Sequence, residues 1–192
     1  MADRCNHYER AFESFVHSLG VPCIGVNENR RASFDEESVK NLDFMVGVGD
    51  GSWLLVDVKG RELQGRRAGL ENWATEDDIS SLQKWENQFG ETSKALLVFV
   101  YHLSSAERRE EFADSFSFAG RQYGAVGIEV GTYRAHMRVR SPRWRTVSLS
   151  RPMFSEYARP LTDWLPSVPR FQERSPAAAM DRFARRESDF PL

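Results

Sequence analysis

Two runs of alternating and β-branched apolar residues flank a glycine-rich segment near the first quarter of the chain. The runs cover residues 42–48 and 53–58, and the sequence Gly-Asp-Gly-Ser at 49–52 separates them. Glycine and aspartate tolerate the positive φ angles of a tight turn, so this pattern predicts a β-hairpin. Successive side chains of a strand point to opposite faces, so we expect Asp57 and Lys59 on one face and the apolar side chains on the other. Asp43 begins the first strand, on the face opposite its apolar neighbours.

In two segments, apolar residues at helical spacing follow a residue pattern that is typical of a helix N-cap. Apolar residues recur at helical spacing from 8 to 19, after Asn6 as N-cap and Glu9 three residues on, and Gly20 ends this helix. A second helix is predicted from a cap at residues 75–78 to about Gly90. Residues 95–101 are apolar without alternation, which is typical of a strand covered on both faces in the middle of a sheet.

The remaining segments give weaker signals. We predict a short strand at 23–26, a loop or short helix at 27–41, a short charged helix at 104–112, and strands at 116–118 and 122–130. Gly124 and Gly127 indicate a bulge or an edge in the last of these strands. A final helix is predicted from Ser150 to about Leu165, where Pro166 ends it.

The order of these elements predicts the fold class. It is α, β, β, β, α, β, which favours a single α/β domain with a mixed sheet over residues 1–165, with an added arginine-rich β segment and a C-terminal helix. Residues 166–192 carry several prolines and are predicted to form a loosely attached tail, with one short helix at 177–186.

Composition and charge narrow the class of protein. The 192 residues are 41% hydrophobic with a formal net charge of -2, which indicates a globular chain and gives no overall argument for a nucleic-acid partner. Cys5 and Cys23 form no metal-ligand spacing and no secreted disulfide framework. With no signal peptide and no apolar run of membrane length, we expect a cytoplasmic protein without a membrane partner.

Asp43, Asp57 and Lys59 together form a candidate catalytic set. Mg²⁺ is held in enzymes by one or two carboxylates together with waters and substrate phosphates. A bound metal lowers the pKa of its water, and a neighbouring lysine can position that water and stabilise charge on phosphate. The alternative is an ordinary ion pair between Asp57 and Lys59 on an exposed sheet, because the D-x-K tripeptide is common by chance.

The hairpin and the order of elements around it resemble the core of the PD-(D/E)xK nuclease superfamily. The resemblance implies a restriction-endonuclease-like fold and hydrolysis of DNA phosphodiesters with Mg²⁺ or Mn²⁺. It implies that Asp43, Asp57 and the backbone carbonyl of Val58 bind the metal and that Lys59 orients the attacking water. Leu42 stands where the superfamily name places proline, which weakens the signal slightly.

Two helical residues extend this resemblance. Archaeal Holliday-junction resolvases of the same superfamily carry Glu-Arg early in the first helix, and Glu9-Arg10 is similar to that pair. Glu9 is then expected to hold the metal through water, or alternatively only to cap the helix. Gln83 matches a glutamine that faces the site in resolvase-like and RecB-like nucleases. The alternative for Gln83 is an ordinary polar helix residue.

Arginine accounts for 22 of the 26 basic residues, and it suits bidentate phosphate contacts. Residues 130–151 contain six arginines and no acid, interleaved with aromatic residues, so they form either a phosphate-binding surface or a solvated β-hairpin. The candidate nucleic-acid contacts are Arg30, Arg31, Arg66, Arg67, Arg134, Arg138, Arg140, Arg143 and Arg145.

The segment His-Tyr-Glu-Arg-Ala-Phe-Glu at 7–13 resembles the signature that names the bacterial HYExAFE family, found mainly in planctomycetes. The resemblance covers about residues 5 to 165 and bears on the domain boundaries, not on the activity.

The leading functional prediction, from the resemblance to the nuclease superfamily, is a Mg²⁺-dependent nuclease acting on DNA, with RNA left open and a homodimer allowed. The alternative is a nucleic-acid-binding or scaffold protein that keeps the fold without cleavage.

Overall fold

The computed structural model describes residues 6–27, 31–34, 37–63, 65 and 68–165. Four α-helices lie within this part of the chain: α1 (His7–Ser18), α2 (Glu76–Phe89), α3 (Val130–His136) and α4 (Arg151–Tyr157). Two 3₁₀ helices, η1 (Ala106–Glu111) and η2 (Leu161–Trp164), accompany them. None of these helices is long and apolar enough to cross a membrane. The predicted 177–186 helix and the tail lie outside the described residues.

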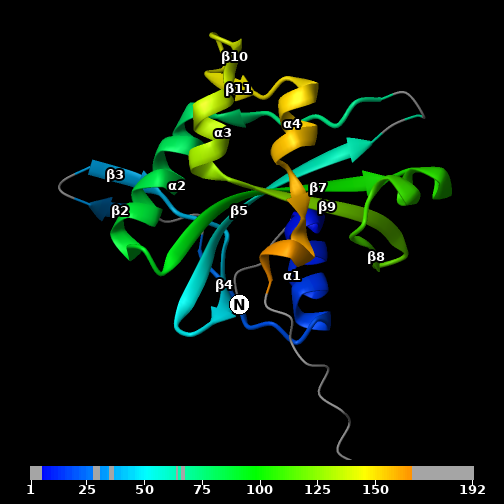
Figure 1. The fold of residues 1–192 in the computed structure, drawn as a ribbon, viewed down its shortest axis with the longest axis horizontal. Coiled ribbons are helices and arrows are strands. Elements are labelled where there is room, and N and C mark those ends of the chain that lie inside the picture. Colours follow the sequence, from blue (N-terminus) through cyan, green and yellow to red (C-terminus); the bar gives the residue numbers. More distant parts are fainter. Residues whose placement is uncertain (1–5, 28–30, 35–36, 64, 66–67, 166–192) are drawn as a thin grey trace, which may run out of the picture.

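A seven-stranded mixed sheet forms the centre of the molecule (Figure 1). Its strands are β1 (Cys23–Gly25), β4 (Phe44–Gly49), β5 (Ser52–Leu63), β7 (Ser93–Leu103), β8 (Ser115–Phe118), β9 (Arg121–Glu129) and β12 (Arg159–Pro160). The order is β1-β4-β5-β7-β9-β12, and β8 also pairs with β9. Strands β5 and β7 run parallel, whereas the other pairs are antiparallel. The predicted mixed α/β sheet is confirmed.

Two smaller sheets lie beside the central one. Strands β2 (Arg31–Phe34) and β3 (Glu37–Lys40) form a hairpin, and β6 (Ala74–Thr75), β10 (Arg138–Ser141) and β11 (Thr146–Ser148) form a three-stranded sheet in the order β10-β11-β6. The prediction of a loop or short helix at 27–41 is therefore wrong for β2 and β3. Their short, polar strands lack the apolar alternation on which a strand prediction depends.

Helices cover both faces of the central sheet (Figure 1). Helix α1 and η2 pack on one face, through a buried cluster that includes Phe12, Val56 and Leu161. Helices α2, α3 and α4 pack on the other face, through a second cluster that includes Leu82, Tyr133 and Phe154. Strand β7 contributes to both clusters, which confirms the prediction of a central strand buried on both sides.

The prediction of a bulge or an edge at Gly124 and Gly127 is wrong for strand β9. It lies inside the sheet and pairs with β7 in continuous register from Gln122 to Glu129, so it is neither bulged there nor at an edge. A Cβ atom on Gly124 would lie 2.3 Å from the ring of Phe112, and one on Gly127 would lie 3.0 Å from the indole nitrogen of Trp164. These glycines make room for aromatic rings.

The C-terminal part also differs from the prediction. Residues 130–136 form α3 rather than part of a β-hairpin, and the arginine-rich hairpin begins only at Arg138. The last helix is shorter than predicted, because α4 ends at Tyr157 and Arg159 and Pro160 then pair with β9. The predicted charged helix at 104–112 is a 3₁₀ helix over Ala106–Glu111.

Candidate catalytic cluster on strand β5

The β4–β5 hairpin brings Asp43 and Asp57 together. Its turn has positive φ at Gly49, Asp50 and Gly51, as the sequence predicts. Phe44 pairs with Val56, so the residue before Phe44 and the residue after Val56 lie across from each other. Both carboxylates are buried, with 5% of Asp43 and 3% of Asp57 exposed. Two acidic side chains therefore share one small site inside the sheet layer.

Asp43 is anchored by the backbone of the neighbouring strand. The amide of Val58 donates to Asp43 Oδ2 at 2.7 Å, and the Asp43 amide donates to the Val56 carbonyl at 2.9 Å. Burial and the negative charge of Asp57 raise the pKa of Asp43 well above its ordinary value, and Glu9 raises it further. The hydrogen bond from Val58 and the charge of Lys59 act in the opposite direction without cancelling this rise.

Helix α1 places Glu9 near enough to Asp43 for its charge to raise the pKa of that carboxyl. Asn6 caps the helix through its side-chain carbonyl, which accepts the Tyr8 amide at 3.1 Å, and its side-chain amide donates to Glu9 Oε1 at 2.6 Å. Gly60 permits the close approach of α1 to β5, because a Cβ atom there would lie 2.1 Å from the Tyr8 ring. Glu9 is only 5% exposed, so the helix presents a buried third carboxylate near Asp43.

Lys59 lies on the same face of β5 as Asp57. Its ammonium is 2.5 Å from Asp57 Oδ2 and 3.0 Å from Asp78 Oδ2. Burial by itself would lower the pKa of Lys59, but Asp57 and Asp78 raise it above its usual range. The side chain is therefore held in its protonated form.

Asp78 and Lys40 also belong to the cluster, although the sequence did not predict them as site residues. Asp78 is in the first turn of α2, where it forms a capping box with Thr75, and its carboxylate also binds Lys59 and Lys40. The Lys40 ammonium is 2.6 Å from Asp78 Oδ1 and 3.7 Å from Asp57 Oδ1. Asp78 was recognisable as part of a cap, but its second role depends on where α2 packs.

Gln83 does not join this cluster. Its side-chain amide donates to Glu86 Oε2 at 2.8 Å and to Asn87 Oδ1 at 3.4 Å, both further along α2. The side of α2 that faces the cluster carries Asp78 and Ser81, whose hydroxyl accepts the Lys40 amide at 3.1 Å.

The candidate phosphate-binding arginines are spread over the molecule. Arg30, Arg66 and Arg67 lie outside the described residues. Arg31 binds the hydroxyl and carbonyl of Ser38 and pairs with Asp77 at 3.6 Å. The others are exposed on α3 and on the β10–β11 hairpin: Arg134, Arg138, Arg140, Arg143 and Arg145.

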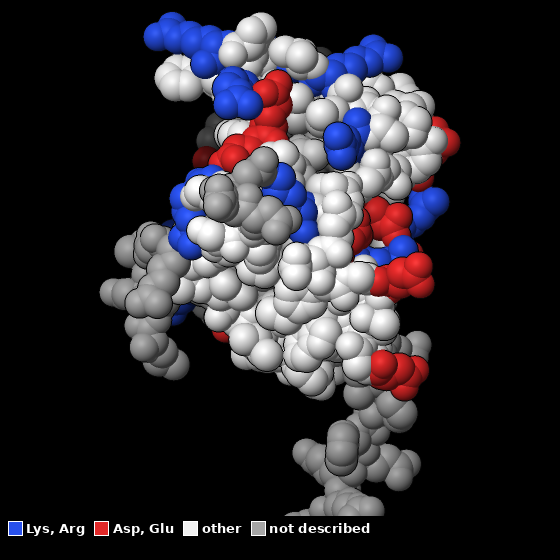
Figure 2. All heavy atoms as spheres, turned by 90° about the vertical axis from the view of Figure 1, so that its left-hand side faces the viewer, with Lys and Arg blue, Asp and Glu red and all other residues white. Residues whose placement is uncertain are grey.

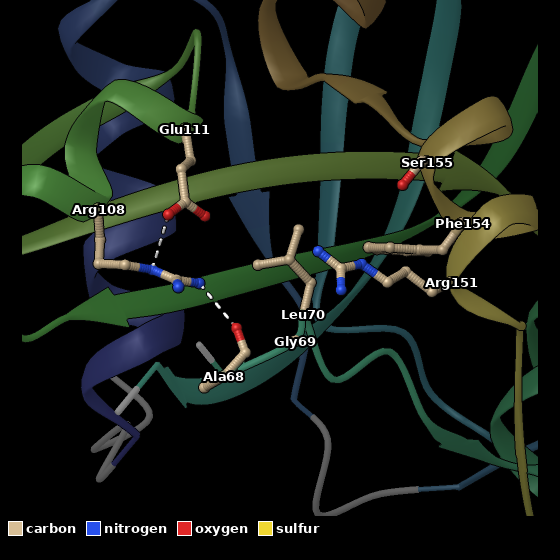
Figure 3. A pocket seen from close by; sticks show the side chains of 8 residues that line it. All are labelled: Ala68, Gly69, Leu70, Arg108, Glu111, Arg151, Phe154 and Ser155. Atoms are coloured by element: carbon tan, nitrogen blue, oxygen red, sulfur yellow. Dashed lines mark hydrogen bonds and ion pairs between the residues drawn. The ribbon is translucent and has the colours of Figure 1, made fainter. Parts of the chain in front are cut away.

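A pocket of about 440 Å³ lies apart from the cluster, between η1, α4 and residues 68–70 (Figure 3). Arg108 and Arg151 extend into it from opposite sides, with Leu70 between them. The Arg108 guanidinium is 3.1 Å from Glu111 and donates to the Ala68 carbonyl at 3.0 Å, so it serves to hold this loop. The pocket shares no lining residue with the carboxylate cluster.

The cluster fits a divalent cation in its chemistry. Asp43, Asp57 and Glu9 supply carboxylate oxygens, the ligands that Mg²⁺ prefers. Asp57 Oδ2 is buried and, apart from its ion pair with Lys59, has no hydrogen-bond donor in the described part of the chain. Among those residues, no three His, Cys, Asp or Glu side chains are already arranged as a metal-binding group. A bound cation would therefore require these carboxylates to turn toward a common point.

Comparisons with known proteins bear on the fold. No protein-family profile and no curated protein matches the chain. The solved structure of Hjc from Archaeoglobus fulgidus, a Holliday junction resolvase from an archaeal hyperthermophile, superimposes with a TM-score of 0.51. The superposition covers 82% of this chain and 97% of that one, at 14% sequence identity. The chain therefore shares the fold of a resolvase-type nuclease.

Proposed function

We propose that this protein is a metal-dependent nuclease that hydrolyses DNA phosphodiesters with Mg²⁺ or Mn²⁺. The observation that carries the proposal is the meeting of buried Asp43 and Asp57 beside Lys59 on one face of a resolvase-like sheet. Stability alone does not favour this arrangement, because two buried carboxylates at one site repel each other. We further propose that α1, β1, β4, β5, α2 and β7 correspond to the αβββαβ core of the superfamily.

The proposed roles extend the resemblance to the PD-(D/E)xK superfamily. Asp43, Asp57 and the Val58 carbonyl would hold the metal, and Glu9 would hold it through water. When bound, the metal supplies a water of lowered pKa and neutralises charge that develops on the phosphate. Lys59 would donate hydrogen bonds to the attacking water and to phosphate oxygens. Because its pKa is raised, it would act as a fixed positive charge and not as a general base.

DNA is proposed as the substrate because a protein of the same fold is a Holliday junction resolvase. Membership of the HYExAFE family, a domain boundary near residue 165, a homodimer and a cytoplasmic location are further proposals. The homodimer rests on the resemblance to the nuclease superfamily, and the other three rest on the sequence.

The test is incubation of the purified chain with linear, nicked, branched and single-stranded DNA in Mg²⁺, Mn²⁺ or EDTA. Asp57→Asn and Lys59→Ala should abolish metal-dependent cleavage. The matched control is Asp50→Asn, because Asp50 is an exposed carboxylate in the turn of the same hairpin. Cleavage that persists in EDTA, or that survives Asp57→Asn, would refute the proposal.

The second candidate is a nucleic-acid-binding or scaffold protein without catalysis. The observation in its favour is that Lys59 and Lys40 already neutralise both oxygens of Asp57. In that case the cluster is a buried ion-pair network, and its removal destabilises the fold without changing any cleavage. Salt-sensitive DNA binding that survives Asp57→Asn, with no cleavage of any of the four substrates, would select this candidate.

A further inference from the structure

Residues 138–148 form an arm, which consists of β10, a turn and β11, at the upper end of the molecule (Figure 1). No acidic residue occurs from Val130 to Ser155. Two large hydrophobic residues of the arm are open to solvent, with Trp144 69% exposed and Val139 63% exposed. Basic side chains gather at this end of the molecule in Figure 2. The arm therefore combines a largely exposed aromatic ring, whose centre lies 5.2 Å from the Arg143 guanidinium, with a local excess of positive charge.

The base of the arm is held firmly. Val147 pairs with Ala74 and Thr146 with Thr75, and both Val147 and Thr146 are buried. The hydroxyl of Tyr133 donates to the Val147 carbonyl at 3.1 Å. Thr75 is also the cap of α2, whose first turn contains Asp78. The arm is thus bonded to the element that places Asp78 against Lys59.

The turn of the arm has a fixed shape. Arg145 donates its amide to the Pro142 carbonyl at 3.2 Å and has φ of 46°, in the left-handed region that arginine rarely adopts. Its guanidinium lies 3.1 Å from Glu76, and the Glu76 amide donates to the Arg145 carbonyl at 2.9 Å. These contacts hold the turn in a conformation that leaves the Trp144 ring in solvent. Strained backbone of this kind is concentrated at functional sites.

A series of cationic and aromatic side chains connects β5 with the arm. Arg61 lies two residues after Lys59 on the same face of the strand, and its guanidinium is 3.9 Å from the centre of the Trp73 ring. Arg140 of the arm approaches the same ring at 5.3 Å. Glu71 is 4.0 Å from Arg140, but both side chains are exposed, so this ion pair is weak and easily exchanged for a phosphate.

We propose that the arm binds nucleic acid that contains unpaired bases, with Trp144 stacking on one base and Arg138, Arg140 and Arg143 contacting phosphates. Bases of a continuous duplex are stacked on their neighbours and offer no free face, whereas bases at a gap, flap or branch do. The charge of the arm fits a polyanion, and the contact with Trp73 directs the strand toward Arg61 and Lys59. This proposal rests on the proposed function, since it names the substrate feature recognised beside the cluster.

The test measures binding without cleavage. Fluorescence anisotropy in EDTA compares the full-length chain on two labelled DNAs of equal length, a continuous duplex and the same duplex with a short single-stranded gap. Trp144→Ala should weaken binding to the gapped DNA about tenfold, because one stacked base is lost. Its effect on the duplex should stay within about threefold. Trp144→Phe, which keeps an aromatic face, should retain most of the preference for gapped DNA.

The matched control is Ile24→Ala, because Ile24 is an exposed hydrophobic residue on β1, 51% open to solvent. It should leave both affinities unchanged. Arg140→Ala should weaken binding to both DNAs and reduce the salt dependence of each. Trp144 is 69% exposed, so its variants should keep the circular dichroism spectrum of the parent chain.

The outcomes separate this proposal from the nuclease proposal. If Trp144→Ala removes the preference for gapped DNA, the arm proposal stands even when no cleavage occurs with Mg²⁺ or Mn²⁺. If Trp144→Ala leaves both affinities unchanged, it is overturned even when Asp57→Asn abolishes cleavage. A parent chain that binds neither DNA would also overturn it, and a protein partner would then be the better occupant of the arm.

Discussion

The carboxylate of Asp78 lies 3.0 Å from the ammonium of Lys59, and the same oxygen accepts the amide of Thr75 at 2.9 Å. One side chain therefore both caps α2 and orients the lysine of the candidate catalytic cluster. The start of the helix and the centre of β5 are coupled through a single group.

Asp78→Asn should destabilise the protein, because it weakens the cap and leaves Lys59 and Lys40 with less compensating charge. We expect the free energy of unfolding at neutral pH to fall by about 1–3 kcal/mol. Urea denaturation measures it. Asp77→Asn, at the exposed position next to it, should change stability by less than about 0.5 kcal/mol. Equal effects of the two substitutions would show that the cluster does not stabilise the fold.

The stability that Asp78 provides should depend on pH. Burial by itself would raise the pKa of Asp78, but Lys59 and Lys40 lower it below its ordinary value of 3.8. A lowered pKa in the folded state means that the unfolded chain takes up its proton first as the pH falls. The contribution is therefore complete well above pH 3.8 and is lost as the pH falls through the folded-state pKa. The stability gap between the parent chain and Asp78→Asn should accordingly narrow in acid, as urea titrations between about pH 3 and pH 7 would reveal.

Mg²⁺ should stabilise the folded chain through Asp43 and Asp57. At a free concentration of about ten times the dissociation constant, the gain is roughly 1.4 kcal/mol, or about 3–5 °C in the midpoint of thermal unfolding. Asp43→Asn should lose this response, whereas Asp50→Asn should keep it. A midpoint that rises equally in all three proteins would indicate a general salt effect.

Gly60→Ala should separate α1 from β5. The added Cβ atom would lie 2.1 Å from the Tyr8 ring, so the ring must shift, and we expect α1 and Glu9 to shift with it. We expect a loss of about 1–3 kcal/mol in stability and a fall in cleavage of about tenfold to a hundredfold. Gly131→Ala is the control, because a Cβ atom there meets no other atom within 4 Å. If cleavage by Gly60→Ala equals that of the parent chain, Glu9 has no part in the reaction.

Local patterns in the sequence were sufficient to predict the main helices and strands. Helix α1 and its Asn6 cap, the β4–β5 hairpin, α2 and the buried strand β7 are all confirmed, because each follows from periodicity, turn chemistry or capping within one segment. The placement of Asp43 across from Asp57 followed from the hairpin. Their roles in binding metal stay a prediction.

The features that the sequence did not reveal depend on contacts between distant segments. Lys40 belongs to a polar hairpin with no apolar alternation, and it joins the cluster only because β3 packs beside α2. Gly124 and Gly127 indicate irregular backbone when only β9 is considered, but they accommodate Phe112 and Trp164 from other elements. No pattern within one segment predicts which ring will fill such a space.

Strand β6 is only two residues long, but it joins the arm to the carboxylate cluster. Ala74 pairs with Val147 in the arm, and Thr75 caps the helix that holds Asp78 against Lys59. The spacing between Trp144 and the cluster is therefore set by hydrogen-bonded backbone and not by a free linker. A DNA strand whose unpaired base stacks on Trp144 would therefore span a fixed distance to Lys59. Its cleavage products would end a constant number of nucleotides from that base.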